Sequence, residues 1–216
     1  MEFSDKARPT QDLEELKREY GAKMSKDYSS KTEWRFGSEK PHPWVGFKTT
    51  DPSHHKSSDF AYLVHAIRPY EYEHPNKPIE YFLKKPIVSM SLVFNGNSEA
   101  FYRVGFILSV PSGNIVAARP HDIAGFISKE NTTEEQFNKA IQEATEIWGV
   151  WSPEDLKRFS KIENKYNEVY AISGYRYSTK PKIKISGIFV NRDSRKDIYD
   201  LAKSIQSELK VPMVKI

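Results

Sequence analysis

The chain contains no cysteine among its 216 residues. Disulfide bonds, thiol nucleophiles and zinc sites with cysteine ligands are therefore excluded, and folding does not depend on the redox compartment. No run approaches the roughly 20 apolar residues that a transmembrane helix needs. The first residues, from Met1 to Lys6, form no cleavable apolar segment. These absences predict a soluble protein without a membrane span. It would be cytoplasmic, or secreted without a classical signal peptide.

The common nucleotide-binding loops are also missing. The sequence has neither a Walker loop nor a Gly-x-Gly-x-x-Gly fingerprint, which argues against a P-loop NTPase and against a Rossmann enzyme. It has no Gly-x-Ser-x-Gly elbow of the α/β-hydrolase type. An excess of one charge sign is nearly absent, since 33 basic residues face 29 acidic ones for a net charge of +4. Such a balance permits contact with phosphates but does not single out nucleic acid as a partner.

The residues that are present divide the chain into two parts. An apolar fraction of 38% and an aromatic fraction of 13% are enough to build a core. Residues 1–58 are predicted to form a helical and loop-rich N-terminal arm, with a helix over 10–20. The stretch 21–58 has no sustained period, and it is compatible with a lid over a site or with a mobile linker. Residues 59–216 are predicted to form a mixed α/β domain.

Apolar periodicity predicts the elements of this domain. Short apolar runs predict strands over 60–67, 87–94, 102–110, 115–118, 166–172, 182–190 and 211–216. Apolar stripes predict helices over 79–83, from 133 to about 148, from 153 onwards, and from 195 to 209. The expected N-caps are Thr132 or Thr133, Ser152 and Ser194. The last three elements form a β-α-β tail. The predicted class is therefore α+β, with a mixed, largely antiparallel sheet and flanking helices.

One carboxylate stands out because Glu168 interrupts the apolar and aromatic strand predicted over 166–172. A carboxylate flanked by Val169 and Tyr170 is expected to be half-buried, which restricts the partners that it can have. Upstream, His65 lies in the first predicted strand and Ser89-Met90-Ser91 lies in the second. This order of segments, completed by 104–111, resembles the ADP-ribosyltransferase family of toxins and effectors.

The resemblance implies a split mixed sheet and NAD as the cofactor. It implies that Glu168 is catalytic, that His65 holds the cofactor, and that Ser89 and Ser91 orient the glutamate and the ribose. Aromatic side chains such as Phe94, Phe101 and Tyr102 would stack on nicotinamide. Many members carry Glu or Gln two residues before the catalytic glutamate, whereas this chain has Tyr166 there. Tyr166 would then border the acceptor and would fit an acceptor class other than arginine, or the site would be inactive.

The activity implied is transfer of ADP-ribose from NAD to a macromolecular acceptor, or hydrolysis of NAD. The expected acceptor is a protein. The residues themselves leave plainer readings open. Glu168 is equally compatible with an ion pair to a basic residue. His65 alone is more typical of a satisfied core histidine. Ser89 and Ser91, which share one face of a strand, are compatible with simple cross-strand hydrogen bonds.

Two further groups of residues suggest other functions. His54 and His55 with Asp51 and Asp59 have the residue types of a metal site, but adjacent histidines diverge and no metal is predicted. The runner-up function is a non-catalytic interaction protein with a basic, nucleic-acid-binding surface. Its candidate residues are Trp34, Arg35, Lys40, Trp44, Lys48 and Lys56 in the arm, and Arg176, Lys180, Lys182 and Lys184 near the end.

Overall fold

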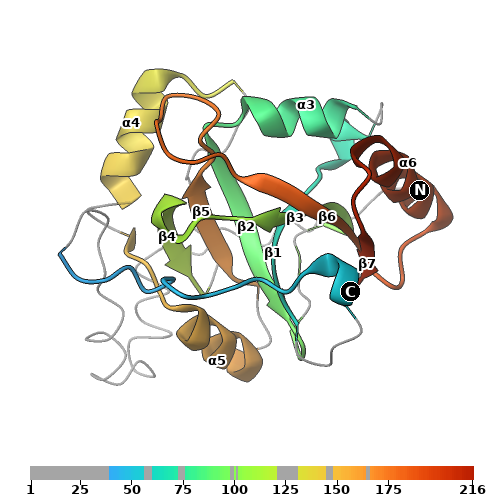
Figure 1. The fold of residues 1–216 in the computed structure, drawn as a ribbon, viewed down its shortest axis with the longest axis horizontal. Helices are drawn as coiled ribbons and strands as arrows, with labels where there is room; N and C mark the ends of the chain where they lie inside the picture. Colours follow the sequence, from blue (N-terminus) through green and yellow to red (C-terminus); the bar gives the residue numbers. More distant parts are fainter. Residues whose placement is uncertain are drawn as a thin grey trace.

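A seven-stranded mixed sheet forms the centre of the protein (Figure 1). The computed structural model describes residues 39–55, 60–72, 76–97, 100, 102–120, 131–144, 148–163 and 166–216. The strands are β1 (Ala61–Ala66), β2 (Ile87–Phe94), β3 (Val104–Ser109), β4 (Ile115–Arg119), β5 (Glu168–Ile172), β6 (Lys184–Val190) and β7 (Met213–Lys215). Their order in the sheet is β4-β5-β2-β1-β3-β6-β7. Neighbours are antiparallel, apart from the parallel pair β6 and β7.

The helices lie at the ends and on the faces of this sheet. The described α-helices are α3 (Lys77–Lys84), α4 (Glu134–Glu143), α5 (Pro153–Glu163) and α6 (Lys196–Leu209), and the 3-10 helices are η1 (Pro52–His54), η2 (Pro69–Glu71) and η3 (Ser112–Asn114). Helix α4 lies beside β4 and β5, whereas α6 lies beside β6 and β7 (Figure 1). In the part of the chain that the structure describes, no helix combines the length and the apolar character that a membrane span needs.

The two faces of the sheet are covered differently. One face, here called the α3 face, carries Val88, Met90 and Leu92 of β2. It packs against apolar residues of three helices, namely Phe82 of α3, Leu156 of α5 and Ile198 of α6. The opposite face, here called the α4 face, holds two smaller apolar clusters. One lies under α4 against β4 and β5, and the other is built mainly from β1, β2, β3, β6 and β7.

The described part of the predicted arm, residues 39–55, packs onto the sheet. Trp44 is 1% exposed, and its indole Nε1 donates a hydrogen bond to the Trp151 carbonyl at 2.8 Å. Thr50 accepts a hydrogen bond from the Ala61 amide through its side chain at 2.9 Å. This segment is therefore integrated with the core at these points. The helix predicted over 10–20 lies outside the described residues.

The predicted strands are all found, with ends that differ by at most two residues. The coarse class is confirmed: α+β with a mixed, largely antiparallel sheet and a β6-α6-β7 tail. Thr133, one of the two predicted N-cap residues, caps α4, and it forms a capping box with Gln136. The predicted N-cap of α6 is wrong, because Arg195 occupies that position and the Ser194 hydroxyl instead donates to the Arg103 carbonyl at 3.4 Å.

Candidate active site around Glu168

Glu168 is the first residue of β5, and it is buried, with 4% of the residue exposed. The hydroxyl of Ser89 on β2 donates a hydrogen bond to its Oε1 at 2.6 Å. A donor on a neighbouring strand thus fixes one oxygen of the carboxylate, and bonds of this length to a charged acceptor are among the stronger ones. On the other side of β5, Arg119 of β4 stands directly opposite Glu168 in the antiparallel ladder. Directly opposite residues project from the same face, so a half-buried arginine borders the carboxylate.

The polar residues form a group on the α4 face of the sheet. Ser89 and Ser91 alternate with the apolar residues of β2 that belong to the α3 face, so both point toward the α4 face. Glu168 lies on the same face, as its bond to Ser89 shows. To one side is the apolar cluster under α4, and to the other is the cluster around Tyr62 and Val64 of β1. The Glu168 carboxylate and the hydroxyls of Ser89 and Ser91 therefore lie between two apolar clusters.

Side chains replace the backbone ladder on both sides of β2. Toward β5 the ladder runs from Ile87 to Met90, and beyond it the Asn167 amide continues the pairing. Its Oδ1 accepts from the Leu92 amide and its Nδ2 donates to the Leu92 carbonyl, both at 2.8 Å. Toward β1 the ladder ends at the pair Val64 and Ser91. Beyond that pair, His65 Nδ1 lies 2.7 Å from the Ser89 carbonyl. The backbone ladder is thus interrupted on both sides of β2, and the side chains of Asn167 and His65 bind the backbone groups of β2 there.

His65 does not share the face of Glu168. Its imidazole is on the α3 face, with ring centroids 5.8 Å from Phe82 and 6.4 Å from Phe106. It is 5% exposed, and Nε2 is 3.0 Å from Nζ of Lys85. Burial and the Lys85 charge hold the pKa of His65 well below its usual value, so the ring is neutral. Both ring nitrogens therefore have protein partners, in contrast to the direct cofactor contact that the resemblance implies.

The other predicted site residues are spread over the fold. Phe94 is 3% exposed and belongs to the core of the α3 face. Tyr102 is half-buried just before β3, and β3 lies three strands from β5. Tyr166 is 6% exposed and precedes β5 by two residues. Phe101 lies outside the described residues. The structure therefore brings Ser89, Ser91 and Glu168 together, while Phe94 and His65 are on the opposite face.

Several polar residues near the site were not identified from the sequence. Arg119 follows a predicted strand by one position, and only the strand pairing shows that it faces Glu168. Asn167 directly precedes Glu168, and its type was the available signal, since a buried amide on a strand needs several hydrogen-bond partners. Glu71 and Lys85 are each 1% exposed on the α3 face beside His65. No local sequence pattern marks them, because burial of this pair is a product of the tertiary fold.

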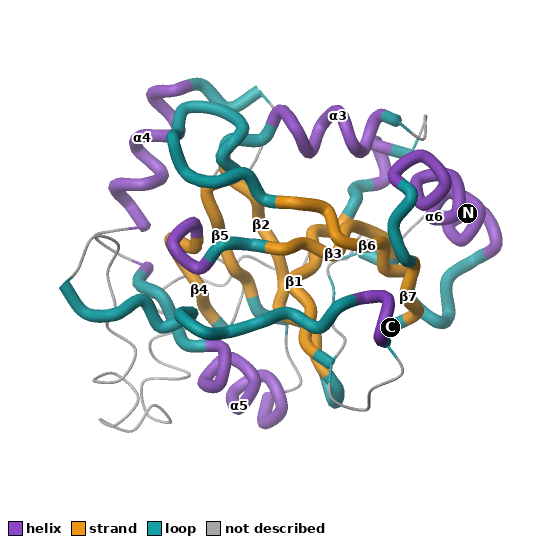
Figure 2. The backbone as a smooth tube through the Cα atoms, viewed as in Figure 1, coloured by secondary structure: helices purple, strands orange, loops and turns teal. Residues whose placement is uncertain are grey.

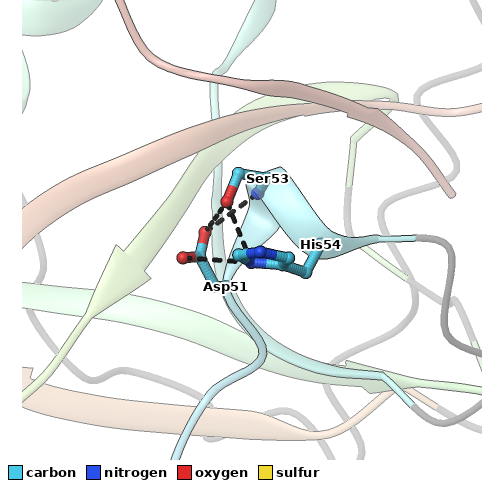
Figure 3. A network of polar contacts seen from close by, with 3 residues as sticks. All are labelled: Asp51, Ser53 and His54. Atoms are coloured by element: carbon cyan, nitrogen blue, oxygen red, sulfur yellow. Dashed lines mark hydrogen bonds and ion pairs between the residues drawn. The ribbon is translucent and has the colours of Figure 1, made fainter.

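His54 belongs to η1 and lies beside Asp51 and Ser53 (Figure 3), and His55 follows η1 in the chain. Asp51 caps η1 by accepting from the amide and hydroxyl of Ser53, and its Oδ2 is 3.4 Å from Nδ1 of His54. His55 turns elsewhere, with Nδ1 at 2.9 Å from the Tyr62 hydroxyl. Asp51 and Ser53 both approach the same ring nitrogen of the exposed His54. In a catalytic triad the acid and the hydroxyl bind different nitrogens of the histidine, so this group is a local cap of η1 and not a triad.

Comparison of the chain with protein-family models, with curated proteins and with solved structures finds no match.

Proposed function

We propose that this protein is an NAD-dependent ADP-ribosyltransferase or NAD glycohydrolase, with Glu168 as its catalytic carboxylate. The observation that supports the proposal best is the 2.6 Å bond from the Ser89 hydroxyl to Glu168 Oε1. It joins two residues 79 positions apart in the sequence, and the family resemblance implies that Glu168 is catalytic and that Ser89 orients it. A toxin or translocated effector is the biological role that fits such an activity.

The reaction needs a carboxylate of this kind. Cleavage of the bond between ribose C1′ and the nicotinamide nitrogen sends the bonding electron pair to the ring, so that neutral nicotinamide leaves. The ribose becomes oxocarbenium-like, and Glu168 would stabilise its positive charge. Water or an acceptor nucleophile then bonds to C1′ and loses a proton. Ser89 would keep one oxygen of Glu168 in place, and the carboxylate would accept a hydrogen bond from a ribose hydroxyl.

The apolar clusters on either side of Glu168 would favour stabilisation of the oxocarbenium-like ribose. An ionised carboxylate interacts more strongly with a developing cation where water is excluded. Glu168 lies between the cluster under α4 and the cluster around Tyr62. Arg119 on the same face adds a cationic group, which would suit a substrate that carries phosphates. Ser91, next to Ser89 on this face, would contact the ribose.

The proposal is tested with NAD labelled in its adenylate half. The protein is incubated with this NAD and a cell lysate, and label is followed both in free ADP-ribose and in acceptor macromolecules. We expect label in one of the two products with the wild type and a loss of about 10²-fold or more with Glu168→Gln. The glutamine keeps an oxygen that can accept from Ser89, so the fold is preserved. Equal labelling by the variant would contradict the role of Glu168.

A second candidate function is binding of an anionic macromolecule without catalysis. The connection from β5 to β6, which follows a loop path beside α4 (Figure 2), has no acidic residue and carries Arg176, Lys180 and Lys182. The Arg176 guanidinium lies 4.6 Å from the ring centroid of Tyr177. In the described part of the arm, however, buried Trp44 cannot act as a stacking platform. Trp34, Arg35 and Lys56 lie outside the described residues.

Salt dependence distinguishes this second function. Binding of a single-stranded oligonucleotide through these cations should weaken steeply as the salt concentration rises. Replacing Lys180 and Lys182 by Gln should reduce both the affinity and the salt slope, whereas Glu168→Gln should leave them unchanged. Absence of measurable binding at low salt would reject the second function and leave the enzyme proposal unaffected.

A further inference from the structure

A buried ion pair lies on the α3 face, directly behind the candidate site. Nζ of Lys85 is 3.7 Å from Oε1 of Glu71, and each side chain is 1% exposed. Lys85 also approaches Nε2 of His65 at 3.0 Å. Taking two charges out of water is costly, and replacing such a pair with apolar residues often leaves stability unchanged or improves it. Stability alone is therefore a weak reason for these three residues to be together.

The ion pair determines where the imidazole proton lies. An ammonium group has only donors, so Nε2 of His65 must accept the hydrogen bond from Lys85. In the neutral ring the proton then lies on Nδ1, which donates to the Ser89 carbonyl at 2.7 Å. The ring is neutral because burial and Lys85 lower its pKa. Glu71 forms an ion pair with Lys85, and Lys85 favours the Nδ1–H tautomer of His65. In that tautomer His65 donates to the Ser89 carbonyl of β2.

Ser89 connects this network to Glu168 through the sheet. Its carbonyl is bound by His65 where the β1–β2 ladder has ended, so the imidazole replaces a backbone partner. Its hydroxyl binds Glu168 on the opposite face at 2.6 Å. A single residue thus carries one contact to each side. Any shift of the Ser89 backbone moves the donor that holds the carboxylate.

We propose that Glu71, Lys85 and His65 are positioning residues, which fix Ser89 from behind the sheet and through it orient the Glu168 carboxylate. The inference rests on the proposed function for its catalytic consequence. The series of contacts from Lys85 through His65 and Ser89 to Glu168 does not depend on that function. It also gives His65 a role other than direct contact with the cofactor. A misplacement of the carboxylate by a fraction of an ångström lowers turnover more than it lowers substrate affinity.

The test uses the double variant Glu71→Gln/Lys85→Met. Removing both charges together avoids leaving one buried and unpaired, which would threaten folding. The matched control is Arg103→Met, which removes the exposed pair between Arg103 and Asp193 at the other side of the sheet. Circular dichroism establishes that each variant is folded. Nitrogen-15 spectra then report the tautomer of His65, and carbon-13 spectra report the Glu168 carboxyl.

We expect the double variant to lose the single His65 tautomer and to shift the Glu168 carboxyl resonance, although Glu168 is on the other face. We expect kcat for nicotinamide release to fall about 10-fold with KM nearly unchanged. The control should change none of these. A folded double variant with the wild-type Glu168 resonance would overturn the proposal. If the wild type releases no nicotinamide but the resonance still shifts, the proposed function fails and the positioning network stands.

Discussion

Removing the Ser89 hydroxyl isolates the contact on which the candidate site depends. In Ser89→Ala the Glu168 carboxylate loses its 2.6 Å donor from β2, while the Ser89 carbonyl that binds His65 is retained. A hydrogen bond to a charged group contributes about 1.5–3 kcal/mol. Since about 1.4 kcal/mol of barrier corresponds to a factor of ten in rate, kcat/KM should fall about 10- to 100-fold.

The assay is nicotinamide release from NAD, measured with purified Ser89→Ala, wild type and a matched control. Ser186→Ala is that control, because its hydroxyl on β6 donates to the Ile107 carbonyl at 3.2 Å and removing it deletes a comparable group elsewhere in the sheet. Thermal unfolding of both variants shows whether the loss is one of stability. Wild-type kcat/KM in Ser89→Ala, or the same decrease in Ser186→Ala, would contradict a role of the Ser89 hydroxyl in holding Glu168.

Three further predictions concern the surroundings of the site. Asn167→Ala leaves the Leu92 amide and carbonyl without their side-chain partner, so the free energy of unfolding in urea should fall by about 1–3 kcal/mol for each group, and an unchanged midpoint would contradict this. Burial lowers the pKa of His65 and His42 below 6.5 in the fold, so the unfolded chain alone takes up these protons as pH falls. Stability should therefore be full above pH 6.5 and be lost below it by up to about 1.4 kcal/mol per pH unit per histidine. A His65→Asn variant should show a shallower loss, and an equal slope would reject the assignment. Arg119→Gln should raise KM for NAD more than it lowers kcat if the guanidinium binds substrate phosphates, and an unchanged KM would exclude that role.

The elements were predictable because their signals are local. Apolar runs bounded by turn residues mark β2 and β3, and the capping box at Thr133 fixes the start of α4. The error at Ser194 has a physical origin, since a serine before an apolar stripe also suits a loop in which its hydroxyl binds another backbone group. The face shared by Ser89 and Ser91 followed from period two alone.

The environment of His65 could not be predicted in the same way. Strand β1 is apolar on both faces, so alternation gave no sign of the direction in which His65 points. Its partner Lys85 comes from the end of α3, and Glu71 comes from η2. Buried charges of this kind depend on tertiary pairing, whereas the sequence shows only ordinary surface residue types. The same applies to Arg119, which only the β4–β5 register places opposite Glu168.

The most direct test of the central claim is nicotinamide release from NAD by the wild type beside Glu168→Gln, with NAD binding measured on both by calorimetry. We expect release by the wild type and a decrease of about 10²-fold or more in the variant. NAD binding should be retained in the variant, because the amide keeps the acceptor for Ser89. A variant as active as the wild type would contradict the claim, and so would a wild type that neither binds NAD nor releases nicotinamide.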